Sequence, residues 1–415
     1  MSRSPHLTAT AVLACVLMLA AAACGTSVTN LAPELVSGNT AFGIDLFSQL
    51  AENAPEGNLF VSPYSISTAM AMTWAGARGR TAEQMAEVMR FGVPDSEVHS
   101  LFGSIQMKLG EGYRREYVQG TGDPLTLEVA NAIWAQEDYE LLDDYVSTVR
   151  GDYRAEARNL DFTSDPDGSR ETINAWVEEK TRGRIRDLLG PGSIDPYTRL
   201  VITNAVYFKG SWRDPFEESA TREGSFTTAA GEEVTVPMMH QTESFPYLEA
   251  DGCRAVELPY ADNSSSMICL LPDGDINEFE QALTEQRLID IITRLRSTEV
   301  ELAMPSFEFT SQFGLSDVLK TMGMTMPFDS QEADFSGMTG RRELYISAVI
   351  HKAFVKVDEE GTEAAAATAV VMALTSAAPE PEPIVLSLDR PFLFLIHDKI
   401  TGSVLFMGRV ADPSA

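Results

Sequence analysis

From Asn39 to Val410 the chain runs without an internal repeat, a low-complexity block or an interdomain linker. Glycine and proline interrupt it only at the spacing of ordinary loops. This continuity predicts one large domain, although the length of 415 residues would also hold two or three ordinary domains. The 44% of hydrophobic residues is enough for a sizeable core, so disorder and fibrous repeats are excluded.

Amphipathic helices are concentrated in the first half of the chain. A capping box at Thr81-Ala82-Glu83-Gln84 predicts the start of a helix that runs to Met89. Apolar residues recur at helical spacing in three further segments, which predicts helices with one buried face. These are a helix carrying Phe42, Ile44, Phe47 and Leu50, a helix from Ser169 to Leu189, and a helix from Glu278 to Leu295.

Strand-like runs dominate the second half of the chain. They are Leu200 to Phe208, Val300 to Met304, Tyr345 to Val357, Leu386 to His397, and Val404 to Val410. Strict alternation of strand and helix is rare. Helices first and strands later predict an α+β fold with large mixed sheets.

The chain is strongly acidic. Lys and Arg number 31 against 61 Asp and Glu, for a formal charge of −30. Such a surface repels phosphate backbones, because proteins bind them through Lys and Arg that release counterions. We therefore expect no nucleic-acid partner. Four cysteines are too few for a disulfide-built scaffold.

Residues 1–23 have the features of an export signal. Arg3 precedes an apolar stretch from Leu7 to Ala23, which is short for a membrane-spanning helix. Small residues directly before Cys24 resemble a bacterial lipoprotein cleavage site, so we expect lipidation at Cys24, with simple secretion as the alternative. Residues 24–37 would then be a tether, and residues 38–415 the folded domain.

Two cysteines, Cys253 and Cys269, lie within the domain. A turn at residues 261–264 would pair the strands that carry them as a hairpin. That hairpin places Cys269 opposite about Glu257, and four residues of offset at about 3.3 Å each is too far for a disulfide. We expect two buried free thiols.

The histidines give no sign of a metal site. Apart from His6 in the signal, His99, His240, His351 and His397 are far apart and lack metal-ligand spacing. Helical zinc motifs, paired cysteines, phosphate loops and nucleophile elbows are also absent from the sequence. We expect no metal and no cofactor.

A hydrolase is a distant alternative function for this chain. Members of a Ser-His-Asp triad need no proximity in sequence, and Ser62 or Ser65 with His351 is the one pairing to consider. Buried serines and a histidine that satisfy backbone groups are the simpler interpretation. We therefore expect that the protein is not an enzyme.

The segment from Glu359 to Ala378 has an unusual composition. It is rich in alanine, follows a strand-like run, and precedes Pro379-Glu380-Pro381-Glu382-Pro383. With period two, its small and apolar side chains from Thr362 to Leu374 fall on one face, so the segment could enter a sheet without clashes. A flexible linker or an alanine-driven helix would explain the composition equally well.

Several blocks in order along the chain resemble the serpin family, the serine protease inhibitors that trap proteases by a conformational change. The resemblance covers residues 39–413. The blocks are Asn58-Leu59-Phe60-Val61-Ser62-Pro63, Asn204-Ala205-Val206-Tyr207-Phe208-Lys209-Gly210, Glu257-Leu258-Pro259-Tyr260, Leu271-Pro272-Asp273, Asp358-Glu359-Glu360-Gly361-Thr362-Glu363-Ala364-Ala365, Arg390-Pro391-Phe392, and Leu405-Phe406-Met407-Gly408-Arg409.

The resemblance implies one serpin-like domain with a central mixed β-sheet, additional sheets, and about eight or nine helices. It also implies an exposed reactive-centre loop at about residues 359–385. In the family a protease cleaves this loop and forms an acyl-enzyme, and the freed arm then inserts into the central sheet before the acyl bond is hydrolysed. The protein would be a secreted or lipid-anchored bacterial member that acts as a suicide substrate.

The family's hinge would lie at the start of this loop. Bulky, charged or proline residues, which are common there in members that do not inhibit, are absent apart from the alternate-facing Glu363, so an inhibitor is favoured. A non-inhibitory serpin that binds other molecules or acts as a chaperone is the alternative. The hinge residues are Glu360, Gly361, Thr362, Glu363, Ala364, Ala365, Ala366, Ala367 and Thr368.

By the same resemblance, Ser62, Ser65, Asn204 and His351 would form a polar cluster where the strands part, and Trp212 would cover the point where the loop first enters. Ordinary core packing would explain the same residues.

Counting along the family's loop places the scissile bond after Thr375, with Leu374 and Ser376 as neighbouring possibilities. Residues 361–389 contain no Lys or Arg, so trypsin-like targets are not expected. The resemblance then implies a target serine protease of the elastase, chymotrypsin or subtilisin type, with papain-like cysteine proteases as a further possibility. We expect a monomer without a heparin-type site, since such a site needs a basic patch.

Overall fold

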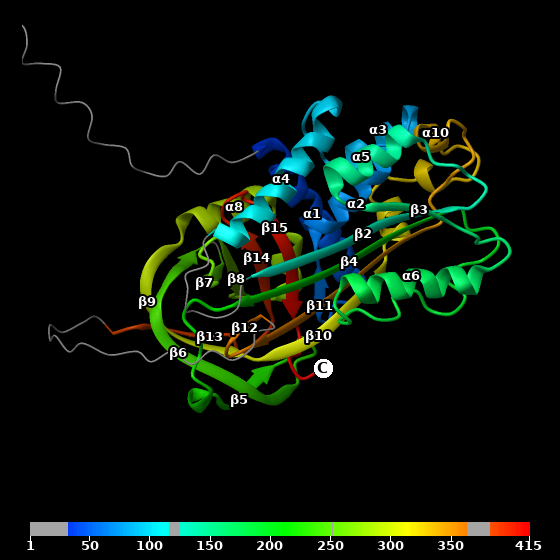
Figure 1. The fold of residues 1–415 in the computed structure, drawn as a ribbon. Coiled ribbons are helices and arrows are strands. Elements are labelled where there is room, and N and C mark those ends of the chain that lie inside the picture. The colour runs from blue at the N-terminus through cyan, green and yellow to red at the C-terminus, as the bar shows by residue number, and fades with distance from the viewer. Residues whose placement is uncertain (1–31, 116–124, 251, 363–381) are drawn as a thin grey trace, which may run out of the picture.

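The structure is a computed structural model that describes residues 32–115, 125–250, 252–362 and 382–415 (Figure 1). These residues form ten α-helices, two short 3-10 helices and fifteen strands. The α-helices are α1 (Pro33–Asn53), α2 (Pro63–Trp74), α3 (Gly79–Met89), α4 (Asp95–Arg115), α5 (Asp143–Tyr153), α6 (Pro166–Lys180), α7 (Ile276–Gln281), α8 (Glu285–Arg294), α9 (Ser316–Thr321) and α10 (Ser336–Thr339). The 3-10 helices are η1 (Glu218–Ala220) and η2 (Met326–Phe328).

The strands build two sheets, and the predicted α+β class is confirmed. A nine-stranded sheet has the order β1-β15-β14-β8-β7-β6-β9-β13, with β5 paired to β6. A six-stranded sheet has the order β10-β11-β12-β4-β2-β3. The strands are β1 (Leu59–Val61), β2 (Thr126–Gln136), β3 (Glu156–Leu160), β4 (Leu200–Ser211), β5 (Arg222–Thr227), β6 (Glu233–Ala250), β7 (Cys253–Pro259), β8 (Ser265–Pro272), β9 (Arg296–Pro305), β10 (Phe307–Gly314), β11 (Ala348–Asp358), β12 (Gly361–Thr362), β13 (Ile384–Ser387), β14 (Phe392–Asp398) and β15 (Val404–Val410).

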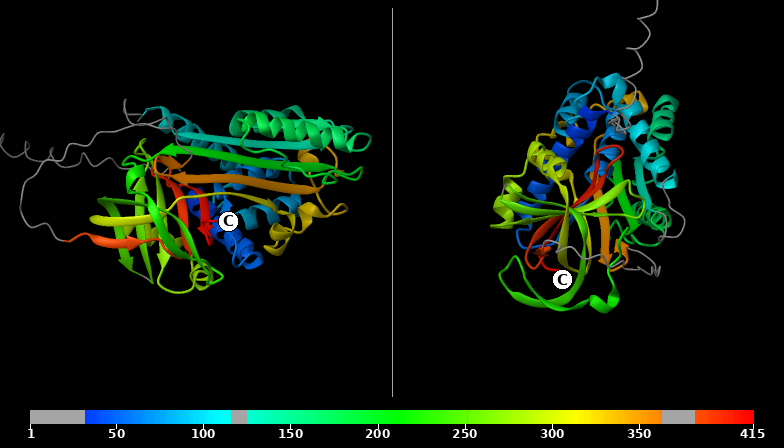
Figure 2. Two further views of the ribbon diagram at one scale, coloured as in Figure 1. Left: turned by 90° about the horizontal axis from the view of Figure 1, so that it is seen from below. Right: turned by 90° about the vertical axis from the view of Figure 1, so that its left-hand side faces the viewer.

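The six-stranded sheet is covered on both faces (Figures 1 and 2). Helix α2 contacts β2, β4 and β15, so it lies between this sheet and the nine-stranded one. All twelve residues of α2 are buried, and Ser62 caps its first turn by accepting a hydrogen bond from the Ser65 N–H. Helix α6 packs on the opposite face, where the Trp134 and Trp176 rings meet edge to face at 5.4 Å. Strand β4 is therefore buried almost throughout, as expected for a strand covered on both sides.

Two predicted helices end or begin elsewhere than expected. The capping box at Thr81 does not form, because α3 already begins at Gly79. Thr81 Oγ1 instead accepts a hydrogen bond from the Asp334 N–H, and Gln84 Oε1 accepts one from the Met326 N–H. Thr81 and Gln84 therefore bind backbone groups that are distant in sequence and do not cap their own helix.

The predicted helix from Ser169 to Leu189 ends at Lys180.

Two other predicted elements are divided. The segment from Glu278 to Leu295 forms α7 and α8, because the Thr284 side chain caps a new helix by accepting from the Arg287 N–H. The run from Leu386 to His397 forms β13 and β14, which are not neighbours in the sheet. Pro391 has no N–H to continue a strand ladder, so the strand is interrupted there.

The N-terminal boundary of the domain lies earlier than expected. Helix α1 begins at Pro33, and Leu35 and Val36 are buried, so residues 33–37 belong to the domain rather than to a tether. Cys24 and the proposed signal lie outside the described residues. None of the described helices is long and apolar enough to span a membrane.

The two buried cysteines are free thiols, as predicted. Their strands pair as the hairpin of β7 and β8, but the register differs by one residue from the expected one. Cys269 lies opposite Val256 rather than Glu257, and Cys253 lies opposite Pro272.

Candidate functional site

The central feature of the six-stranded sheet is the boundary between β4 and β11. These strands pair directly in parallel from Val201 and Ala348 to Val206 and Ala353. Beyond that point they separate, and β12 lies between them, antiparallel to both. We call this boundary the gap. At one end it contains the two residues of β12, which follows β11 after a short turn.

Gly361 is required by the close approach of β12 to β4. It lies opposite Ser211, and a Cβ on Gly361 would lie 2.2 Å from the Gly210 carbonyl oxygen. No side chain fits at that distance without moving the backbone. The next residue, Thr362, is buried, and its hydroxyl is 2.8 Å from the Tyr260 hydroxyl.

The turn before β12 is fixed by hydrogen bonds to its backbone groups. Asp358 Oδ1 accepts from the N–H groups of Glu360 and Gly361, at 3.1 and 3.3 Å. The Trp212 N–H donates to the Glu360 carbonyl at 2.9 Å, and its indole N–H donates to the Asp358 carbonyl at 3.0 Å. The Trp212 ring stacks on Tyr260 with centroids 4.9 Å apart. Trp212 thus lies directly against the turn from which the segment enters the gap.

The structure brings Ser62, Ser65, Asn204 and His351 together beneath the closed part of the gap. His351 and Asn204 lie directly opposite each other on β11 and β4, and His351 Nδ1 contacts Asn204 Oδ1. His351 Nε2 accepts a hydrogen bond from the Ser62 N–H at 3.3 Å. Asn204 Nδ2 donates to Ser65 Oγ. The cluster therefore joins both strands of the gap to the start of α2.

Asn131 on β2 is a further member that the sequence analysis missed. It lies opposite Asn204, whose Nδ2 donates to Asn131 Oδ1, and its own Nδ2 donates to the Ser65 carbonyl at 3.3 Å. The available signal was an asparagine inside the apolar run from Val129 to Trp134, since a buried amide needs partners.

The polar cluster is neutral and closed to solvent. Burial lowers the pKa of His351 to about 3, so its ring carries no charge at neutral pH. Because Nε2 accepts from the Ser62 N–H, the single ring proton is on Nδ1 and is donated to Asn204. Every group in the network then has a complementary partner.

This geometry does not form a hydrolase site. Ser62 Oγ donates to the Leu405 carbonyl at 2.7 Å and not to His351. The group on His351 Nδ1 is the Asn204 amide, where a triad has a carboxylate. Ser62, Ser65 and His351 are 1%, 0% and 0% exposed, so substrate has no access to them. Among the described residues, side chains are nowhere grouped to hold a metal ion.

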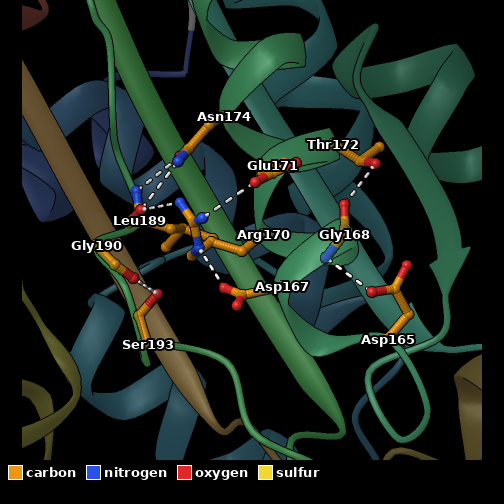
Figure 3. A network of polar contacts seen from close by, with 10 residues as sticks. All are labelled: Asp165, Asp167, Gly168, Arg170, Glu171, Thr172, Asn174, Leu189, Gly190 and Ser193. Atoms are coloured by element: carbon orange, nitrogen blue, oxygen red, sulfur yellow. Dashed lines mark hydrogen bonds and ion pairs between the residues drawn. The ribbon is translucent and has the colours of Figure 1, made fainter.

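A segment that follows α6, residues 181–199, crosses the gap on the face opposite the polar cluster, and we call it the strap. Figure 3 shows how α6 holds it. The Asn174 side chain exchanges two hydrogen bonds with the Leu189 backbone, at 2.8 and 2.9 Å. The strap is also tied to the far side of the gap, because Lys352 Nζ on β11 donates to the Arg186 carbonyl at 2.8 Å. Gln312 Nε2 on β10 donates to the Leu188 carbonyl at 3.0 Å.

The remaining predicted site residues lie outside the described residues. They are the hinge residues Glu363, Ala364, Ala365, Ala366, Ala367 and Thr368, the reactive-centre residues Leu374, Thr375 and Ser376, and the lipidation site Cys24.

Comparison with solved structures identifies the fold. Thyroxine-binding globulin from human aligns with a TM-score of 0.82 at 28% identity, covering 92% of this chain and 99% of that one. Uncleaved ovalbumin aligns with a TM-score of 0.80 at 28% identity, covering 92% and 100%. A highly specific serpin from the insect Tenebrio molitor aligns with a TM-score of 0.80 at 29% identity, covering 91% and 98%.

Sequence comparison agrees with the structural match. Leukocyte elastase inhibitor from Bos taurus is 40% identical, over 92% of this chain and the whole of the relative. A serpin-like protein from Thermococcus kodakarensis is 41% identical, over 91% of this chain and 86% of that protein. The family model described as "Serpin (serine protease inhibitor)" matches residues 37–413. The chain belongs to the serpin family of serine protease inhibitors.

Proposed function

We propose that this serpin inhibits serine proteases by inserting its cleaved reactive loop between β4 and β11. The observation that carries the proposal is β12, because two hinge residues already occupy the gap and pair with both of its strands. The rest of the arm would extend β12 along the same path. Strand addition of this kind satisfies two ladders of backbone hydrogen bonds at once.

The register of β12 predicts where each inserted residue would lie. Thr362 lies between Gly210 of β4 and Val357 of β11. Since the arm is antiparallel to both, moving six residues on to Thr368 moves six residues back on each strand, to Asn204 and His351. The Thr368 hydroxyl would therefore enter between these two side chains and replace their direct contact.

The composition of the arm fits this path. Residues opposite one another on neighbouring strands point to the same face. Every second residue from Thr362 onward would face the polar cluster and α2, and these are Ala364, Ala366, Thr368, Val370 and Met372. They are small where strands β4 and β11 must first part, and larger toward the far end of the sheet.

The length of the arm is sufficient to move a trapped protease. In the proposed reaction the protease serine attacks the carbonyl of Thr375, the bond to Ser376 breaks, and an ester joins the two proteins. The fourteen residues from Thr362 to Thr375 extend to roughly 46 Å at about 3.3 Å per residue. The ester would therefore be carried past Leu200, at the far end of β4.

The target class follows from the loop sequence. No Lys or Arg occurs between Gly361 and Asp389, so an acidic specificity pocket has nothing to bind. Leu374 and Thr375 suit proteases with apolar pockets, of the elastase, chymotrypsin or subtilisin type. The similarity to leukocyte elastase inhibitors supports the first of these. A papain-like cysteine protease is a secondary target class.

The test is incubation of the full chain with elastase, chymotrypsin and subtilisin, followed by a denaturing gel. We expect a covalent complex of the two proteins and release of a C-terminal peptide that begins at Ser376, within one residue. Thr362→Arg places a charge in the buried hinge position and should convert the protein from inhibitor to substrate, because the arm can no longer insert.

Thr293→Arg, an exposed change on α8, is the matched control and should leave complex formation intact. A covalent complex formed equally well by Thr362→Arg would contradict insertion. Cleavage after Arg390 alone would contradict the assigned reactive centre.

A non-inhibitory role in binding or as a chaperone is the alternative. The alignment with thyroxine-binding globulin supports this possibility, since that protein's name refers to binding a small molecule.

We also propose that the protein is exported and carries a lipid on Cys24. The proposal is supported by the apolar residues 7–23 and the small residues before Cys24. A fatty-acid analogue should label the wild type in a bacterial host, and Cys24→Ala should lose the label. An unlabelled wild-type chain in the culture medium would indicate simple secretion instead.

A further inference from the structure

The end of the gap opposite β12 is flanked by two segments that lie beyond the paired strands. Strands β4 and β11 begin at this end, which lies toward α10 in Figure 1. The last residues of the strap lead into β4, and residues 344–347 lead into β11. Contacts between these two segments hold the far end of the gap closed.

Three hydrogen bonds cross the far end of the gap. The Ser347 N–H donates to the Leu200 carbonyl at 2.9 Å, and the Ser347 hydroxyl accepts from the Arg199 N–H at 2.9 Å. The Tyr345 hydroxyl donates to the Tyr197 carbonyl at 2.9 Å. We call these three hydrogen bonds the latch. Two of them depend on side chains, so they can be removed singly without changing the backbone.

Each side of the latch is held in place by its own surroundings. The Tyr197 N–H donates to Asp195 Oδ1 at 2.8 Å, and the Arg199 carbonyl accepts from the Gln136 N–H of β2 at 3.0 Å. On the other side, the Tyr345 side chain packs against the hydrophobic core. The latch therefore joins two fixed segments, and it has to break before the far end of the gap can open.

The register of β12 indicates which residues of the arm would meet the latch. Ten residues beyond Thr362, Met372 would lie between Leu200 and Ser347. The residues before Met372 can therefore enter the gap while the latch is closed. The last residues of the arm, which end at Thr375 and its ester, can enter only after the latch has opened.

We propose that the latch is a separate barrier to the last step of insertion, and that Ser347 and Tyr345 are positioning residues that set how far the ester is carried. This inference rests on the proposed insertion of the loop. While the arm is held at the latch, water can attack the ester carbonyl, which leaves a carboxylic acid on Thr375 and returns the protease serine as a free hydroxyl. An arm that passes the latch in time completes the trapped complex.

The test uses peptides in place of the cleaved arm, so that no protease is needed. One fluorescent peptide has the sequence of residues 363–370 and ends before the latch, and the other has the sequence of residues 363–375 and extends past it. Each is incubated with the full chain, and its incorporation is followed by fluorescence anisotropy. We expect Ser347→Ala and Tyr345→Phe to incorporate the longer peptide about twofold to tenfold faster than the wild type, because each removes one hydrogen bond of the latch. The shorter peptide should enter at the wild-type rate.

Two further variants separate the latch from a general loosening of the fold. Ser347→Thr keeps the hydroxyl and should incorporate both peptides at the wild-type rates. Ser193→Ala removes an exposed hydroxyl that donates to the Gly190 carbonyl within the strap at 2.8 Å, and it should change neither rate. Equal acceleration of both peptides by Ser347→Ala, or acceleration of neither, would overturn the proposal.

A measurement with proteases separates this proposal from the proposed function. With a protease that the wild type traps incompletely, Ser347→Ala should raise the fraction of cleaved serpin that ends in the covalent complex. If the peptides show the expected difference but no protease forms a covalent complex, inhibition is contradicted and the latch is supported. If neither peptide enters the wild type, both proposals are contradicted.

Discussion

His351 links two strands that must separate if a third strand is to enter between them. Its imidazole is fully buried, accepts from the Ser62 N–H and lies against Asn204 across the gap. Both contacts require the neutral ring, because a protonated Nε2 would point a second hydrogen at the Ser62 N–H. Protonation and opening of the gap should therefore be linked.

The pH dependence of stability tests this link. Burial lowers the pKa of His351 from 6.5 to about 3, so this residue stabilises the native state fully above pH 6.5 and loses that contribution as the pH falls toward 3. At pH 4.5 the loss should be about 3 kcal/mol. Between pH 7 and pH 4.5, the free energy of unfolding measured in urea should therefore fall about 3 kcal/mol less in His351→Gln than in the wild type. An equal fall in both would contradict the link.

At the scale of elements, the strap and α6 act across the gap. Helix α6 packs on β2 through Trp176 and Trp134, whereas the strap is bonded to β10 and β11 through Gln312 and Lys352. The unit therefore bridges the gap on the face opposite the polar cluster. An arm that enters the gap would have to loosen one side of this bridge. The two hydrogen bonds that tie the strap to β10 and β11 are part-buried or exposed, whereas the Trp176 side chain that packs α6 on β2 is buried.

Lys352→Met tests the bridge. It keeps the aliphatic length of the side chain and removes the hydrogen bond to the Arg186 carbonyl, which from a charged donor contributes about 1.5–3 kcal/mol. If part of that energy opposes opening, the second-order rate constant of protease inactivation should rise up to about tenfold. Lys320→Met, on α9 and away from the gap, is the control and should not change the rate. An unchanged or slower rate in Lys352→Met would show that the strap does not limit insertion.

At the scale of the whole molecule, the closed gap is an incomplete sheet. Strands β4 and β11 pair directly over about half of their length, and β12 shows that they accept another strand between them. Complete insertion would turn the six-stranded sheet into one with a long antiparallel strand at its centre. The native chain would then be less stable than its cleaved form.

Cleavage of the loop should therefore raise thermal stability. An arm of about ten inserted residues forms two hydrogen-bond ladders at about 0.5–1.5 kcal/mol per bond, which corresponds to a rise in Tm of roughly 20 °C for a domain of this size. The measurement is calorimetry before and after cleavage between Glu363 and Pro383 by a protease that is not trapped. A melting temperature that does not change would favour a non-inhibitory serpin.

Much of the fold was predictable because the relevant signals are local. The period of apolar residues indicated α1 and α6, and the run from Leu200 to Phe208 indicated a strand. The boundaries were less predictable. Thr81 has the pattern of a helix cap but accepts from Asp334, more than two hundred residues away, and only the folded chain brings the two together.

The sequence by itself determined the class of fold, the free thiols, the family, and the small side chains of the hinge, because composition and short-range spacing carry that information. Tertiary structure alone decided that β12 lies inside the gap, that Asn131 completes the polar cluster, and that Lys352 ties the strap to β11. Each of these depends on strand register and on contacts between segments far apart in the chain. Such contacts are selected by packing and by the need to satisfy buried polar groups. A local pattern can mark a buried polar residue such as Asn131, but it does not identify the partners of that residue.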